Sequence, residues 1–213
     1  MNAHTRRWTL AGPAGPLEVA VDEPAGPPRG VVLVCHPLPT HGGTMDNKVV
    51  QTLGRASVSL GLRAVRFNFR GVGASAGTFD GGPGEIADAL AVLHAVREPG
   101  LPMALAGFSF GGFVATRVAE HEAQADRPVD HLALVGLAAS RFPATTVPAD
   151  TLVVHGENDD VVPLGAVLDW ARPQGLPVTV VPGAGHFFHG QLGLIKNLLV
   201  RAWGPAFLAA HPA

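Results

Sequence analysis

Several residue types and patterns are scarce in this sequence of 213 residues. Only one residue, Cys35, is a cysteine, so no intrachain disulfide can form and a reducing, cytoplasmic setting is expected. Charged residues make up only 15% of the chain, the net charge is −2 and no basic run occurs, which argues against a nucleic-acid surface. The longest apolar runs are far too short to cross a bilayer, so we expect no membrane partner.

The residues that are abundant point to a globular α/β protein. The chain is 47% hydrophobic, and its 27 glycines and 19 prolines fall between apolar segments, as the turns of a fold with many elements do. Because no repeat or linker interrupts it, we expect residues 1–213 to form one domain. The pair Arg6-Arg7 is similar to a twin-arginine export signal, but Pro13 and Pro16 follow instead of an apolar stretch, so an edge strand is the better interpretation.

Strand and helix patterns alternate along the chain. The expected strands are 5–10, 17–22, 31–35, 62–69, 103–106, 132–137, 151–155 and 178–181, and the expected helices are about 46–60, 83–97, 113–121, 163–171 and 191–203. The alternation predicts a mostly parallel sheet, with the first two strands antiparallel at one edge. Arg66 and Asn68 are unexpected in such a strand, and we expect them to bond to the loop that follows it. Pro205 either ends or kinks the last helix, which otherwise continues toward Ala210.

One stretch combines a buried strand, a sharp turn and a helix. The apolar run 103–106 leads to Gly107-Phe-Ser-Phe-Gly111, and an amphipathic run follows. Glycines two residues before and after Ser109 suit a strained turn with positive φ, because a Cβ at either position would keep strand and helix apart. Such a turn lifts the serine hydroxyl clear of the sheet and places the Phe110 N–H at a helix N-terminus, where an oxyanion can bind.

A serine, an acid and a histidine follow three of the predicted strands in that order. Ser109 follows the strand at 103–106, Asp159 and Asp160 follow the strand at 151–155, and His186 follows the strand at 178–181. In a parallel sheet these positions meet at the carboxyl ends of the strands, where sites form. A nucleophilic serine needs a base, and the base needs an acid that fixes its tautomer. The sequence therefore predicts a catalytic triad.

These residues resemble the α/β-hydrolase superfamily over nearly the whole chain. The motifs that carry the resemblance are Gly107-Phe-Ser-Phe-Gly111, His155-Gly-Glu-Asn-Asp-Asp-Val-Val-Pro163, Gly185-His186 and Arg70-Gly-Val-Gly-Ala-Ser75. His36-Pro-Leu-Pro39, Arg66-Phe-Asn-Phe-Arg70 and His186-Phe-Phe-His189 resemble a small bacterial branch related to dienelactone hydrolases. The resemblance implies an eight-stranded, mostly parallel sheet with helices on both faces and no cap domain.

The resemblance also assigns expected roles to residues. Ser109 would be the nucleophile, His186 the general base and Asp159 the acid, with the adjacent Asp160 as its rival. The oxyanion would bind the N–H groups of Phe110 and Leu38. Relatives often carry His-Gly before the second donor, whereas this chain has His36-Pro37, and proline has no N–H.

Other polar residues near these motifs have weaker claims. His36 and His189 are candidates for substrate binding, although backbone bonding by His36 and a place at the pocket mouth for His189 are the simpler alternatives. We expect no metal site, because no cysteine or extra carboxylate completes a ligand set with His189, and no cofactor. Cys35 lies inside an apolar run and is expected to be buried and unreactive. Asp46 is expected to cap the helix that starts there.

The segment between the strands at 132–137 and 151–155 is too short for the lid that many α/β-hydrolases insert there. Without a lid, we expect Ser109 to be fairly exposed and the substrates to be small carboxylic esters cleaved through an acyl-enzyme. Thioesters, lactones and peptides are alternative substrates for the same triad. A non-catalytic binding protein on a hydrolase scaffold is the alternative of a different class.

Overall fold

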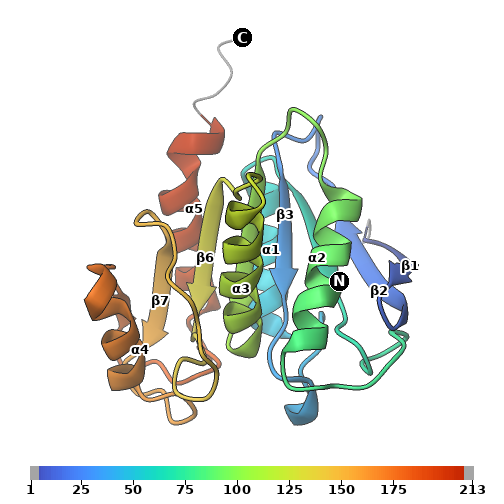
Figure 1. Ribbon diagram of the computed structural model, residues 1–213. Coiled ribbons are helices and arrows are strands. Elements are labelled where there is room, and N and C mark those ends of the chain that lie inside the picture. Colours follow the sequence, from blue (N-terminus) through green and yellow to red (C-terminus); the bar gives the residue numbers. More distant parts are fainter. Residues whose placement is uncertain (1–4, 209–213) are drawn as a thin grey trace.

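The computed structural model describes residues 5–208, whose eight strands form one sheet (Figure 1). The strands are β1 (Arg6–Gly12), β2 (Gly15–Asp22), β3 (Val31–Cys35), β4 (Arg63–Phe67), β5 (Met103–Phe108), β6 (His131–Val135), β7 (Leu152–Gly156) and β8 (Thr179–Val181). The helices are α1 (Lys48–Ser59), α2 (Pro83–Val96), α3 (Phe110–Gln124), α4 (Leu164–Ala171) and α5 (Leu192–Leu208), with short 3-10 turns at Pro39–His41 and Arg172–Gln174.

The strand order is β1-β2-β4-β3-β5-β6-β7-β8. β2 pairs antiparallel with β1 and β4, and every other pair is parallel. Every residue of the central strands β3 and β5 is buried, as the continuous apolar runs predict for strands covered on both faces. The prediction of a mostly parallel, eight-stranded sheet is confirmed.

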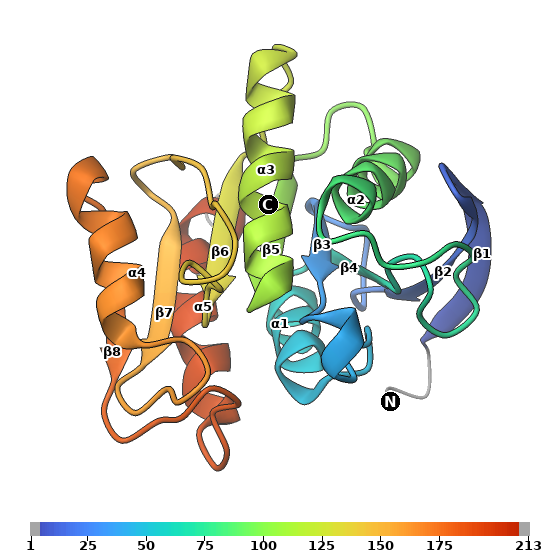
Figure 2. The same cartoon turned by 60° about the horizontal axis from the view of Figure 1, so that its bottom comes forward.

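Helices cover both faces of this sheet, which is also as predicted. Figures 1 and 2 show α2, α3 and α4 on one face and α1 and α5 on the other. Each face has its own apolar core: Val92, Val118 and Val167 belong to the first, and Leu53 and Trp203 to the second. The connection between β6 and β7 contains no helix or strand, so no cap covers the carboxyl ends of the strands.

Arg66 in β4 and Asn68 just after it correct one expectation. Arg66 donates to Asp22 (2.9 Å) and to the main-chain oxygen of Met45 (2.9 Å), while Asn68 donates to Glu18 (2.7 Å) and accepts from the Met45 N–H (2.8 Å). Both side chains therefore join this end of β4 to the neighbouring strand β2 and to the loop before α1, and not to the loop after β4. The local pattern could not predict these hydrogen bonds, because their partners belong to elements distant in sequence.

The start of α1 corrects another expectation. The cap is Asn47, whose side-chain oxygen accepts the N–H of Val49 (2.9 Å), and the helix begins at Lys48. Asp46 instead pairs with Arg7 (2.6 Å) and Arg66 (3.4 Å). Two arginines attract the carboxylate more strongly than the partial charge of one helix end.

The last helix passes through Pro205 and continues to Leu208, while Ala210 lies outside the described residues. None of the helices within residues 5–208 is both long enough and apolar enough to cross a membrane.

Candidate active site

Ser109 lies in a strained turn between β5 and α3. Its φ of 57° and ψ of −118° place it in a region that L-residues rarely occupy. A Cβ on Gly107 would collide with the main chain of Gly111, and one on Gly111 would collide with the main-chain oxygens of Cys35 and His36. The two glycines therefore permit the turn for the steric reason expected from the sequence.

A continuous line of hydrogen bonds joins Ser109, His186 and Asp159. The Ser109 hydroxyl lies 3.0 Å from His186 Nε2, and His186 Nδ1 lies 2.7 Å from Asp159 Oδ2. The Phe108 ring packs at 5.0 Å from the imidazole. This geometry allows His186 to take a proton from the hydroxyl while Asp159 fixes the tautomer and stabilises the imidazolium that forms.

Asp159, and not its neighbour Asp160, reaches His186. Asp159 is buried, and its Oδ1 accepts the N–H groups of Val161 (3.0 Å) and Val162 (2.8 Å), whereas Asp160 is exposed. Burial alone would raise the pKa of Asp159, but hydrogen bonds from His186 and Val162 outweigh it, so the pKa is lowered. The carboxylate is therefore ionised and fixed in place.

Two loops hold the acid and the histidine together. Glu157 N–H donates to the carbonyl of Val181 (3.0 Å), and Asn158 N–H donates to that of Ala184 (2.9 Å). A Cβ on Gly156 would collide with the Ala184 oxygen, so this glycine allows the loops after β7 and β8 to touch. Main-chain contacts thus set the distance between Asp159 and His186.

A second histidine supports the acid, and no role was assigned to it from the sequence. His155 is fully buried, and its Nε2 lies 2.9 Å from the carbonyl of Val162 and 3.4 Å from Asp159 Oδ2. Because a carbonyl can only accept, Nε2 carries the proton, and the buried Nδ1 has no partner among the described residues. Burial lowers the pKa of His155, so the ring is neutral, and its Nε2–H donates to the Val162 carbonyl beside the Asp159 carboxylate. The sequence feature that could have pointed to His155 is its position four residues before Asp159.

A cavity of about 380 Å³ opens onto the serine. Its lining is largely apolar and includes Leu38, Phe110, Phe142, Val162 and Phe187. Leu38 and Phe110 both lie beside Ser109 in this lining, and a residue in the first turn of a helix, such as Phe110, has no carbonyl acceptor within that helix. The cavity therefore has room for a small acyl group next to two candidate oxyanion donors.

The chain matches the family model for "Serine aminopeptidase, S33" over residues 26–144, a span that contains Ser109 but ends before Asp159 and His186. The chain belongs to this family of α/β-hydrolases. It is 39% identical to an α/β serine hydrolase without lid from Xanthomonas campestris, which superimposes with a TM-score of 0.88 over 100% of this chain and 99% of that one.

Two further relatives of the hydrolase cover most of its length. An α/β serine hydrolase homologue from Coxiella burnetii is 42% identical, with a TM-score of 0.84 over 92% of this chain and 96% of that one. An uncharacterized protein from Rickettsia prowazekii (strain Madrid E) is 31% identical over 199 residues, which cover 83% of this chain and 79% of the relative.

His36, a candidate for substrate binding, is fully buried and does not line the cavity. Its Nε2 accepts the Phe69 N–H (3.0 Å), so the proton is on Nδ1, which donates to the carbonyl of Pro37 (2.6 Å). Burial lowers the pKa of His36 to about 4, which keeps the ring neutral. Since the Pro37–Leu38 peptide is trans, fixing the Pro37 oxygen also fixes the direction of the Leu38 N–H. The alternative of backbone bonding by His36 is confirmed.

Two other expectations are wrong: that Ser109 is fairly exposed, and that His189 lies at the pocket mouth. Ser109 is only 6% exposed despite the missing lid, because loops carrying Leu38, Phe142 and Phe187 rise around it as cavity walls. His189 is exposed beside Phe187, at a ring distance of 5.9 Å, but does not line the cavity and precedes α5 by three residues. His41 lines the cavity instead.

Cys35 has no direct part in this site. It is fully buried, as expected, and burial raises the pKa of its thiol to about 12, which disfavours the thiolate. Within residues 5–208 no group of three or more histidine, cysteine or acidic side chains is arranged to hold a metal ion.

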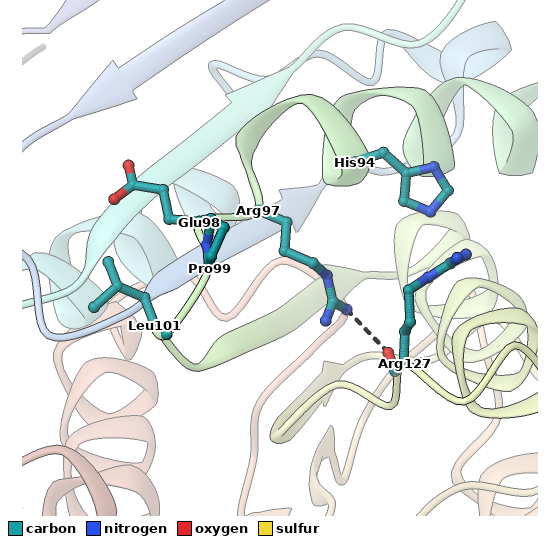
Figure 3. Close-up of a pocket in the computed structure, with 7 residues that line it drawn as sticks. His94, Arg97, Glu98, Pro99, Leu101 and Arg127 are labelled. Carbon is teal, nitrogen blue, oxygen red and sulfur yellow. Dashed lines mark hydrogen bonds between the residues drawn. The ribbon is translucent and has the colours of Figure 1, made fainter.

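A second cavity of about 410 Å³ lies beside the amino end of β5 (Figure 3). His94, Arg97 and Arg127 line it, and Arg97 donates to the main-chain oxygen of Arg127 (3.0 Å). No serine, threonine or cysteine of the described chain lines this cavity. This cavity therefore offers no hydroxyl or thiol nucleophile among the described residues.

Proposed function

We propose that this α/β-hydrolase cleaves small carboxylic esters through an acyl-enzyme intermediate. The observation that carries the proposal is the hydrogen-bonded line from the Ser109 hydroxyl through His186 to Asp159, at the base of a largely apolar cavity. The volume of that cavity suits a short acyl or aryl group, which supports small esters over long-chain lipids.

In the first half-reaction, Ser109 Oγ attacks the ester carbonyl while its proton moves to His186 Nε2. The negative charge that develops on the carbonyl oxygen is stabilised by the N–H groups of Phe110 and Leu38. His186 then protonates the leaving alcohol oxygen, the C–O bond breaks, and the acyl group remains on Ser109.

In the second half-reaction, a water molecule replaces the alcohol. His186 removes a proton from this water, whose oxygen attacks the acyl carbonyl and forms a second oxyanion on the same donors. Collapse of that intermediate releases the carboxylic acid, and the proton on His186 returns to Ser109. Throughout both halves Asp159 keeps the Nδ1 proton in place, which leaves Nε2 as the atom that exchanges protons.

The name of the matching family raises peptide cleavage as a second candidate. An aminopeptidase must bind the free ammonium group of its substrate, and a carboxylate is the usual partner for that charge. Among the described residues, no aspartate or glutamate lines the cavity, and Arg141 in its lining would repel an ammonium group. The cavity therefore favours esters, with thioesters and lactones as substrates that the same mechanism would accept.

The test is pre-steady-state hydrolysis of 4-nitrophenyl butyrate, followed by a panel of thioesters, lactones and aminoacyl anilides. We expect a burst of 4-nitrophenol equal in amount to the enzyme, which is the signature of an accumulating acyl-enzyme. Ser109→Ala should lose the burst, and Ser140→Ala, on the surface loop after β6, should keep it. Cleavage of anilides alone would replace the esterase proposal by a peptidase.

A further inference from the structure

The cavity beside Ser109 contains one permanently charged side chain, that of Arg141. This side chain is exposed and makes no hydrogen bond or ion pair with any residue in the range 5–208. Lys48, Lys196 and Arg201 are unpaired in the same range, but none of these three lines the cavity. Arg141 is thus a free cation placed where substrate must enter.

The second cavity provides a contrast within the same molecule. Arg97 and Arg127 line it (Figure 3), but both also donate to the buried carboxylate of Glu122, at 3.4 and 3.1 Å. Both guanidinium groups therefore already share one carboxylate of the protein. No carboxylate among the described residues does the same for Arg141, so its guanidinium is available to a ligand.

The loop that carries Arg141 is fixed to the nucleophile turn. Ala138 N–H donates to the carbonyl of Ser109 (3.3 Å), and Arg141 N–H donates to the carbonyl of Ala138 (3.1 Å). The next residue, Phe142, packs its ring against Phe110 at 4.8 Å and stacks on Phe113 at 5.1 Å. The main chain of Arg141 is therefore anchored close to Ser109, and only its side chain is left without a partner.

We propose that Arg141 forms an anion subsite, so that the preferred substrates are esters with a carboxylate or phosphate separated from the scissile carbonyl by an apolar spacer. This inference rests on the proposed esterase function. The guanidinium pairs with either anion through two parallel N–H···O bonds. The apolar walls of Leu38, Phe142 and Val162 suit the spacer. An unpaired cation at the cavity also raises the local concentration of anionic substrates.

The experiment compares 4-nitrophenyl esters that differ only in the far end of the acyl chain. One is the monoester of adipic acid, the second carries a terminal carboxamide in place of the carboxylate, and the third carries a terminal phosphate. The carboxamide ester is neutral and nearly the same shape as the carboxylate ester. Its hydrolysis reports the proposed function, and the ratio of the charged to the neutral ester in kcat/KM reports the subsite.

We expect the wild-type enzyme to favour at least one anionic ester about fivefold, the size of one partly exposed ion pair. Arg141→Gln should remove that preference while leaving kcat/KM for the carboxamide ester within about twofold, because the side chain supports no other part of the fold. Arg141→Glu should reverse the preference. Lys48→Gln, which removes an unpaired cation outside the cavity, is the matched control and should leave the ratio unchanged.

The anionic ester that is cleaved faster shows whether the subsite prefers a carboxylate or a phosphate. Two results would overturn the anion subsite and leave the esterase proposal intact. In the first, the wild type cleaves the carboxamide ester and the anionic esters equally well. In the second, it prefers an anionic ester, but Arg141→Gln keeps that preference. Failure to cleave any of the three esters would overturn both.

Discussion

Two buried carboxylates in this hydrolase each bond to a histidine at nearly the same distance. Asp159 lies 2.7 Å from His186 at the carboxyl end of the sheet, and Glu122 lies 2.8 Å from His94 on α3 and α2. The side chains of both acids are fully buried, and hydrogen bonds lower the pKa of both despite the opposing effect of burial. Carboxylate burial and the histidine contact therefore do not distinguish a triad from a structural ion pair.

The two histidines differ in the contacts of their second ring nitrogen and in their exposure. The second ring nitrogen of His186 reaches the hydroxyl of Ser109 in its strained turn, and only 3% of the side chain is exposed. The His94 side chain is 43% exposed, and its acid is already neutralised by Arg97 and Arg127. Asp159 therefore bonds to a histidine that reaches the Ser109 hydroxyl, whereas Glu122 bonds to side chains that join α2, α3 and the loop after α3.

Removing each histidine in turn should give the largest difference in activity between the two sites. His186→Ala should lower kcat for 4-nitrophenyl butyrate by at least about 10³-fold, since the serine loses its base. His94→Ala should leave kcat unchanged. The two variants are measured side by side, with circular dichroism as the check on folding. Equal activity in both variants would remove His186 from the mechanism.

Removing Glu122 should affect stability and not catalysis. In Glu122→Gln, Arg97, Arg127 and His94 lose their shared carboxylate, and we expect a loss of roughly 2 kcal/mol in the free energy of unfolding. Urea titration measures the loss. The activity per folded molecule should stay at the wild-type level, and a large fall in kcat would contradict the structural role.

The same carboxylate should make stability depend on pH. Burial raises the pKa of Glu122, but its bonds to Arg127 and His94 outweigh that effect and lower the pKa from about 4.5 to about 2. Because the folded pKa is depressed, this stabilisation is present above pH 4.5 and is lost as the pH falls toward 2. Chemical unfolding across this range should give a steeper decline for the wild type than for Glu122→Gln. Parallel curves would rule out the predicted contribution.

The smallest expected effect concerns His155, whose Nε2 lies 3.4 Å from the same Asp159 oxygen, Oδ2, that bonds to His186. His155→Leu should lower kcat about tenfold, because the Val162 carbonyl loses its donor and Asp159 loses the polar N–H beside its carboxylate, and should leave KM unchanged because His155 does not line the cavity. His155→Gln keeps a donor near the Nε2 position and should recover most of kcat. A fall in KM and kcat together, without recovery by glutamine, would make His155 a folding residue only.

The comparison also explains how much could be predicted from the sequence. The strands, the parallel sheet and the turn at Ser109 depend on local apolar runs and on Gly107 and Gly111, whose spacing carries a steric meaning. The order of Ser109, Asp159 and His186 depends on where strands end, which the same runs define. These features were therefore predictable, and the sheet is as predicted.

The features that could not be predicted depend on partners distant in sequence. His36 orients the Pro37–Leu38 peptide because the Phe69 N–H, in the loop after β4, donates to its other ring nitrogen. Ser109 is buried because residues from three separate loops form the cavity walls around it. Asp46 pairs with arginines of β1 and β4 instead of capping the helix. The unpaired state of Arg141 likewise depends on which acids come near it. Such choices follow from packing across the fold, which no local pattern records.

The central claim is that Ser109 is an activated nucleophile, and covalent labelling by a fluorophosphonate probe tests it most directly. The account predicts that the wild type gains one probe adduct, located on the Ser109 peptide by mass spectrometry, and that Ser109→Ala gains none. Glu122→Gln should label as the wild type does, since its carboxylate lies outside the triad. A correctly folded wild type that does not label, or that labels at another residue, would contradict the account.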